Sequence, residues 1–158
     1  MLLRELLKDI DVIKADIASD IEISDVCYDS RRVTRGSLFV AVSGFEKDGH
    51  DFIPEAVKKG AAAVICEKKP DIPCNYVLTE NSRRALALVS SSFFGKPAKK
   101  LRVIGITGTN GKTTTTIILK EMLEICSGEK VGLIGTLQNM IGDRVLPAER
   151  TTPESRDL

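Results

Sequence analysis

A lysine and two threonines that directly follow a glycine-rich turn form the chemically most informative part of this sequence. Glycines let the backbone curl so that successive N–H groups point at one anion, and a helix beginning at Lys112 would direct its positive end to the same place. The lysine can then reach the outer phosphates, and the Thr113 hydroxyl can ligate Mg²⁺. The pattern predicts a binding loop for ATP and Mg²⁺, with Lys112 as the catalytic cation. The predicted ATP-binding residues are Gly108, Thr109, Asn110, Gly111, Lys112, Thr113 and Thr114.

The loop departs in one place from the general phosphate-loop pattern G-x-x-x-x-G-K-[ST], because Ile106 stands where that pattern has its first glycine. We interpret the departure as the mark of a narrower family. The alternative is a glycine-rich turn that only joins a strand to a helix. That alternative accounts for neither the lysine nor the threonines that follow.

Alternating strands and helices are predicted on both sides of this loop. A buried strand over residues 102–106 should lead into it, and a helix over 112–126 and a strand over 131–134 should follow. Upstream, the apolar patterns predict helices over 2–10, 53–59 and 82–94 and strands over 21–28, 38–42, 61–66 and 76–78. This order is typical of α/β proteins.

The polar segment 95–100 contains glycine, proline and three lysines, and we place a domain boundary there. The predicted organisation is a small α/β domain over residues 1–97, followed over 98–158 by the start of a P-loop domain with a parallel sheet. Only 46 residues follow Lys112. A P-loop sheet needs several more parallel strands, and Asp143 lies in a turn where it is a poor Mg²⁺ ligand. We therefore expect an amino-terminal fragment of a longer enzyme.

Composition excludes several classes of partner. The 158 residues contain 23 Lys and Arg against 22 Asp and Glu, so a net charge of +1 gives no broad field for nucleic acid or an anionic membrane. No apolar stretch approaches the roughly 20 residues of a membrane helix. The four cysteines are scattered without a metal-binding spacing. They indicate reduced thiols of a cytoplasmic protein.

Four blocks of the sequence resemble the Mur ligases, which build the peptide stem of peptidoglycan. The first is the loop 108–114, and the second is Asp29-Ser30-Arg31-Arg32 with residues 36–41. The third is residues 48–53 with Ala56 and Gly60-Ala61. The fourth runs over 133–136, 146–148 and 151–154. The middle two blocks are common to MurE-type and MurF-type ligases, and the fourth favours the MurE type.

The resemblance implies a substrate site in addition to the ATP loop. Ser30 would bind the uridine diphosphate part of UDP-N-acetylmuramoyl-L-alanyl-D-glutamate, with Tyr28 and residues 45–47 nearby. Thr151 and Thr152 would contact its muramoyl-peptide part. Each of these hydroxyls has an ordinary alternative: Ser30 as a turn serine capping its own backbone, and the threonines as plain loop residues. His50, the single histidine, is interpreted as a structural hydrogen-bonding residue.

The activity implied by the resemblance is ATP-dependent amide formation through an acyl phosphate, which adds an amino acid to the UDP-muramoyl dipeptide. Diaminopimelate, lysine and other residues all stay open as that amino acid, and the oligomeric state is also open. The alternatives are a MurF-type ligase that adds D-alanyl-D-alanine to the tripeptide, and a non-catalytic nucleotide-binding module.

Overall fold

The computed structural model describes residues 1–18, 20–44, 47–146 and 153–157. The chain is divided into two compact units, Met1–Leu101 and Arg102–Leu158. The division falls a few residues after the boundary that the lysine-rich segment predicts. The last residues before it, Pro97–Lys100, form a 3₁₀ turn that belongs to the first unit.

The first unit is built on a five-stranded sheet with the order β1-β5-β4-β3-β2. Strands β2 to β5 run parallel to one another, whereas β1 lies antiparallel to β5 at the edge. The strands are β1 (Val12–Asp16), β2 (Asp25–Cys27), β3 (Ser37–Val40), β4 (Ala63–Cys66) and β5 (Tyr76–Thr79). The α/β class predicted from the sequence is confirmed by this sheet and its helices.

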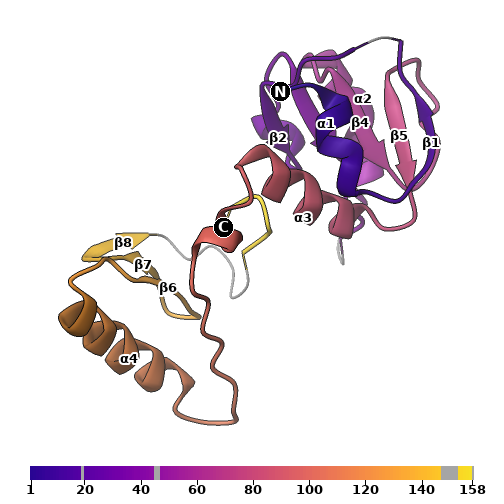
Figure 1. The fold of residues 1–158 in the computed structure, drawn as a ribbon. Coiled ribbons are helices and arrows are strands. Elements are labelled where there is room, and N and C mark those ends of the chain that lie inside the picture. Colours follow the sequence, from indigo (N-terminus) through magenta and orange to yellow (C-terminus); the bar gives the residue numbers. More distant parts are fainter. Residues whose placement is uncertain (19, 45–46, 147–152, 158) are drawn as a thin grey trace. The chain divides into compact units, whose positions relative to one another are not determined.

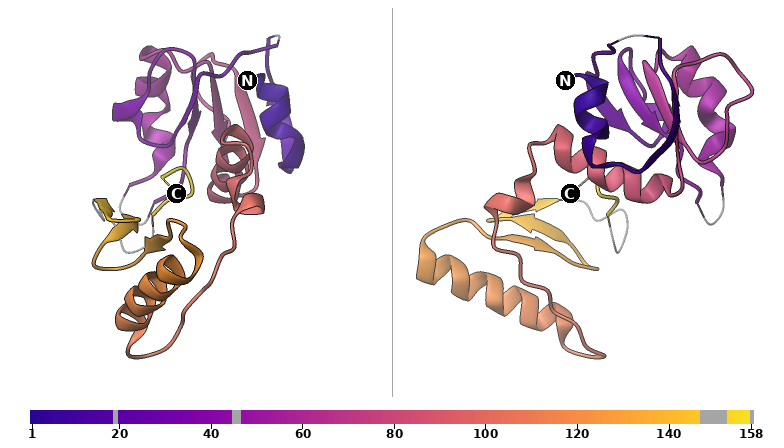
Figure 2. Two further views of the ribbon diagram at one scale, coloured as in Figure 1. Left: turned by 60° about the vertical axis from the view of Figure 1, so that its left-hand side comes forward. Right: turned by 45° about the vertical axis from the view of Figure 1, so that its right-hand side comes forward.

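Helices cover both faces of this sheet, so the unit has three layers (Figures 1 and 2). On one face, α1 (Leu3–Leu6) and α3 (Ser82–Phe93) contribute Leu6 and Leu86 to a fully buried core with alternate strand residues such as Leu38 and Ile65. On the other face, α2 (Ile53–Lys58) contributes Ala56 to a second core. The side chains of β3 and β4 alternate between the two cores, because successive residues of a strand point to opposite faces.

Helix α3 shows why the local sequence folds as it does. Its buried residues are Ser82, Ala85, Leu86, Val89 and Ser90, which recur at helical spacing. The Asn81 side chain accepts a hydrogen bond from the Arg84 amide and caps the first turn. Gly95, with φ of 75°, follows the end of the helix in a left-handed conformation that favours glycine.

The second unit contains the long helix α4 (Lys112–Ser127) beside a three-stranded antiparallel sheet (Figure 1). The strands are β6 (Gly132–Ile134), β7 (Asn139–Ile141) and β8 (Arg144–Leu146). The Glu124 carboxylate accepts a hydrogen bond from the Val131 amide at 2.9 Å and fixes the start of β6 to the end of α4. Among the described residues of this unit, every strand pairing is antiparallel.

The sequence prediction was wrong in one important place. Residues 102–106 form no strand, and Val103 and Ile104 are 77% and 52% exposed. An apolar run becomes a parallel strand only where neighbouring strands accept its hydrogen bonds, and the described part of the second unit offers none beside it. The helix predicted over 2–10 is divided into α1 and the 3₁₀ turn Leu7–Asp9. Strands β1, β7 and β8 were not predicted.

Candidate functional site

The glycine-rich loop of the second unit meets the first turn of α4. Gly111 occupies the N-cap position with φ of 75°, a left-handed conformation in which other residues are strained. No side chain caps this end, so the N–H groups of the first turn of this 16-residue helix are available to another acceptor. An added Cβ at Gly111 would meet nothing within 4 Å. The loop can therefore approach an anion closely at the positive end of the helix.

Lys112 lies over this loop. Its ammonium group donates to the Gly108 carbonyl and, at 3.4 Å, to the Thr109 carbonyl. The structure thus brings together three of the predicted ATP-binding residues and leaves the lysine beside the helix end. Carbonyl oxygens hold the cation there, and a phosphate could replace them as its partner.

The donor groups of this loop suit a nucleoside triphosphate. They consist of free helix amides, the Lys112 ammonium and the Thr113 hydroxyl, and no acidic residue stands in the first turn of α4 to repel phosphate. Within the described residues, no group of three or more His, Cys, Asp or Glu side chains could hold a metal ion by itself. A Mg²⁺ ion at Thr113 would therefore depend on the phosphates for most of its ligands.

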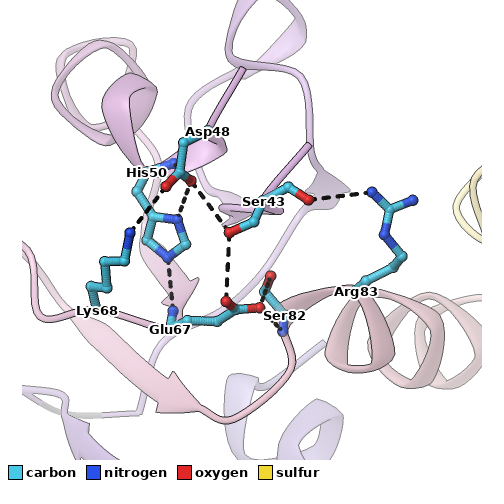
Figure 3. A network of polar contacts seen from close by, with 7 residues as sticks. All are labelled: Ser43, Asp48, His50, Glu67, Lys68, Ser82 and Arg83. Atoms are coloured by element: carbon cyan, nitrogen blue, oxygen red, sulfur yellow. Dashed lines mark hydrogen bonds and ion pairs between the residues drawn. The ribbon is translucent and has the colours of Figure 1, made fainter. Parts of the chain in front are cut away.

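A second polar region lies at the carboxyl ends of the parallel strands in the first unit, where α/β sheets commonly bind ligands. At its centre is His50, with a side chain that is 9% exposed (Figure 3). Its Nε2 accepts a hydrogen bond from the Glu67 amide at 2.8 Å, so its proton lies on Nδ1 and is donated to Asp48 at 2.5 Å. Both ring nitrogens are engaged, as the structural interpretation of His50 predicts.

The carboxylates around His50 connect three loops. Asp48 also accepts from the Lys68 ammonium at 3.2 Å, and Glu67 accepts from both the amide and the hydroxyl of Ser82 at 2.8 Å (Figure 3). Hydrogen bonds from the backbone and ring of His50 hold the pKa of Asp48 well below its usual range. Burial raises the pKa of Glu67, but the hydrogen bonds from Ser82, the nearby His50 and the Ser43 hydroxyl together lower that pKa below its usual value. Both carboxylates are therefore ionised.

Ser30 and Tyr28 lie just beyond the carboxyl end of β2. Ser30 is 6% exposed and begins the 3₁₀ turn Ser30–Arg32, which the Asp29 side chain caps by accepting from the Arg31 amide. The Ser30 hydroxyl is 3.1 Å from Oε2 of Glu55. Tyr28 is partly buried and packs against the core shared by α1 and α3. The sequence reasoning missed Glu55, although a Glu–Lys pair four residues apart on α2 was visible.

Several predicted site residues lie outside the described part of the chain. They are Phe45, Glu46, Thr151 and Thr152. Lys47 is described and exposed, and its carbonyl accepts a hydrogen bond from the Gly44 amide at 3.0 Å.

Two family models match the chain over nearly its whole length. One, the Mur ligase family catalytic domain, matches residues 22–106, and the other, the Mur ligase middle domain, matches residues 106–158. The chain belongs to the Mur ligase family. The two models meet at Ile106, between the end of the first unit and the glycine-rich loop.

Curated relatives of this Mur ligase chain carry one repeated name. A UDP-N-acetylmuramoyl-L-alanyl-D-glutamate--2,6-diaminopimelate ligase of Clostridium acetobutylicum is 47% identical over 162 residues, which cover 100% of this chain and 33% of the relative. Its counterpart in Caldanaerobacter subterraneus is 50% identical over 141 residues, 88% of this chain and 29% of the relative. The chain therefore spans about a third of the length of these relatives.

Solved structures agree on the fold. A diaminopimelate ligase structure superposes with a TM-score of 0.71 over 99% of this chain and 31% of its own, at 23% identity. A MurF ligase of Thermotoga maritima in complex with ADP matches 66% of this chain and 24% of its own, with a TM-score of 0.51 and 37% identity. No helix among the described residues is long and apolar enough to cross a membrane.

Proposed function

We propose that this Mur ligase chain is part of a MurE-type enzyme, which uses ATP to join diaminopimelate to UDP-N-acetylmuramoyl-L-alanyl-D-glutamate. The observation that carries the proposal is the 47% identity to a diaminopimelate ligase over the whole chain. The repeated name among the relatives favours diaminopimelate over lysine. The MurF alternative is weaker, because the MurF structures match only 66–68% of the chain.

We assign the nucleotide sugar and ATP to different parts of the chain. Residues 1–97 would bind the nucleotide sugar at the carboxyl ends of β2 and β3, with Ser30 and Tyr28 near the uridine diphosphate. Residues 98–158 would bind ATP at the loop 108–114, and the family resemblance assigns Thr151 and Thr152 as contacts of the muramoyl peptide. Parallel strands support the first assignment because their carboxyl ends are where such sheets bind ligands. The uncapped start of α4 supports the second.

The reaction requires a carboxylate to approach a polyanion. In the proposed chemistry, the D-glutamate side chain takes the γ-phosphoryl group to form an acyl phosphate, and the amine of diaminopimelate then displaces phosphate. Lys112 and the amides of the first α4 turn would neutralise the charge that develops on the phosphoryl oxygens. Mg²⁺, when bound at Thr113, would supply further charge neutralisation. We place this chemistry in the cytoplasm, where ATP is made available.

Calorimetric titration tests the proposal with the chain and two variants. The wild-type chain should bind both UDP-N-acetylmuramoyl-L-alanyl-D-glutamate and Mg²⁺-ATP. Lys112→Met should weaken ATP binding at least about tenfold, since a charge-assisted contact is lost, and leave nucleotide-sugar binding unchanged. Lys130→Met, an exposed lysine of the same unit, is the matched control. Equal ATP affinity of wild type and Lys112→Met would contradict the assignment of the loop.

The two alternatives predict other results. A MurF-type enzyme would prefer the UDP-muramoyl tripeptide to the dipeptide, and the same titration with both ligands separates the types. A non-catalytic module would bind nucleotide without any ligase activity in the full-length protein. For the 158-residue chain alone we expect no ligase turnover; ATP-dependent phosphate release in the presence of the substrates would contradict that expectation.

A further inference from the structure

Glu55 of α2 and Lys59, the C-cap residue of that helix, hold Ser30 at two points. The Ser30 hydroxyl is 3.1 Å from Oε2 of Glu55, and the Ser30 carbonyl accepts from the Lys59 ammonium at 2.9 Å. Lys59 also pairs with Oε1 of Glu55 at 2.7 Å. The side chain and the backbone of the buried Ser30 thus both form hydrogen bonds with the Glu55–Lys59 ion pair. We refer to Ser30, Glu55 and Lys59 as the Ser30 clamp.

The chemistry of the Ser30 clamp fixes the direction of its hydrogen bonds. An ionised carboxylate can only accept, so the bond between Ser30 and Glu55 uses the one proton of the hydroxyl. The donors of Lys59 and Ser30 lower the pKa of Glu55, in that order, and keep it ionised. The hydroxyl oxygen retains lone pairs but has no proton left to give. It can therefore only accept a hydrogen bond from a ligand.

Only some parts of a nucleotide sugar can provide such a donor. The uracil ring has an imide N–H, the sugars have hydroxyl groups, and the acetamido group has an amide N–H. Phosphate oxygens at neutral pH are acceptors alone, and the Glu55 carboxylate would repel them. An intact Ser30 clamp is therefore incompatible with donation from this hydroxyl to the diphosphate.

We propose that Glu55 and Lys59 are positioning residues that hold the Ser30 hydroxyl in its accepting direction, so that it receives a hydrogen bond from an N–H or O–H group of the nucleotide sugar. The inference rests on the proposed function of the first unit. It adds two residues to that site and specifies which chemistry of the ligand meets Ser30. The clamp residues come from the turn after β2 and from α2, which the fold holds together through the second core.

Titration of Glu55→Gln with UDP-N-acetylmuramoyl-L-alanyl-D-glutamate tests the inference, because the positioning role and the general charge effect change the affinity in opposite directions. Glutamine can donate as well as accept, so the hydroxyl is no longer forced to direct its proton at residue 55. We expect about five- to tenfold weaker binding, the usual cost of one misdirected hydrogen bond. Removing a negative charge near an anionic ligand should by itself tighten binding. Glu80→Gln, an exposed glutamate of the same unit, measures that general charge effect.

Two further variants distinguish positioning from loss of folding. Lys59→Met should weaken binding in the same direction, whereas Lys58→Met, its exposed neighbour on α2, should leave the affinity unchanged. In the double variant Ser30→Ala, Glu55→Gln the loss should be no greater than in Ser30→Ala alone, because Glu55 acts through Ser30. Circular dichroism on each variant checks that the sheet is intact.

The outcomes separate this inference from the proposed function. Unchanged or tighter binding by Glu55→Gln, with normal binding by the wild type, would overturn the positioning role and leave the nucleotide-sugar site standing. Additive losses in the double variant would overturn it as well. If the folded wild-type chain does not bind the nucleotide sugar, the proposed site itself is wrong, and the positioning role is overturned with it.

Discussion

Ser90 is a polar side chain in an apolar environment. It lies on the buried face of α3 with 1% of its surface exposed, and its hydroxyl has no hydrogen-bond partner among the described residues. Ser90→Ala removes this unsatisfied group without leaving a large cavity. We expect the free energy of unfolding in urea to rise by up to about 1 kcal/mol.

Ser82→Ala is the matched control for that prediction, because Ser82 is equally buried on the same helix but bonded. Its hydroxyl donates to Glu67 at 2.8 Å. Loss of a hydrogen bond to a charged group should lower the unfolding free energy by about 1–2 kcal/mol. If both alanine variants were destabilised equally, Ser90 would have a partner that the structure does not reveal.

Asp48 should make the first unit sensitive to acid. Its pKa in the folded chain is lowered by the amide and ring of His50, whereas an unfolded aspartate titrates near about 3.9. The Asp48 contribution to stability is therefore complete above that pH and is lost as the pH falls below it. Urea unfolding from pH 6 to pH 3 should show a smaller loss of stability in Asp48→Asn than in the wild type.

The exposed neighbour Asp51 provides the comparison for this acid titration. Its carboxylate makes no ion pair or side-chain hydrogen bond that the structure records among the described residues. Asp51→Asn should reproduce the wild-type dependence on pH. A wild-type slope in Asp48→Asn would mean that other carboxylates account for the acid sensitivity.

At the scale of secondary structure, the two ends of α4 offer a matched pair of glycines. Gly111 and Gly128 have φ of 75° and 70°, and an added Cβ would meet nothing within 4 Å at either position. Alanine at each should cost about 1–2 kcal/mol of stability through backbone strain alone. Only Gly111→Ala should also weaken ATP binding, because Gly111 alone belongs to the loop that we propose as the ATP site. Equal ATP affinities in calorimetry would contradict this.

Elements whose signal is local were predictable from the sequence. Helix α3 has apolar spacing, a capping asparagine and a terminal glycine, and α2 has an early proline and Gly60 at its end. Strands β3 and β4 are short apolar runs that are buried on both faces. Strand β1 was missed because all five of its residues are exposed and its pairing with β5 connects distant parts of the chain.

The hairpin of β7 and β8 could have been predicted. Gly142 and Asp143 form the two-residue turn between β7 and β8, and a glycine and an aspartate between two short strand-like runs are a recognised hairpin pattern. The glycine-rich loop before α4 could be recognised for a similar reason, since its glycines and lysine are close together in sequence; its role in ATP binding stays a prediction. The bonds from Glu67 to His50 and from Ser30 to Glu55 and Lys59 could not be predicted from the sequence, because the fold joins residues that lie 17, 25 and 29 positions apart.

At the scale of the whole molecule, the division into two units predicts where proteases act. Lys99, Lys100 and Arg102 are exposed, and residues 102–106 form no secondary structure. Limited trypsin digestion should cut here first and leave a resistant fragment of about 100 residues, because cleavage needs locally open backbone. Mass spectrometry identifies the fragment. Equally rapid cleavage at Lys59 or Lys68 would contradict a separately folded first unit.

The solitary imidazole of His50 has a practical consequence. A protein with one histidine gives one set of imidazole signals in a proton or nitrogen magnetic-resonance spectrum. In this chain both imidazole nitrogens form hydrogen bonds with loop residues at the carboxyl ends of the strands. The Nδ1–H tautomer should be visible directly in the nitrogen shifts. A molecule that binds at the carboxyl ends of these strands and disturbs Asp48 or Glu67 should change the chemical shifts of the His50 ring, which need no further assignment.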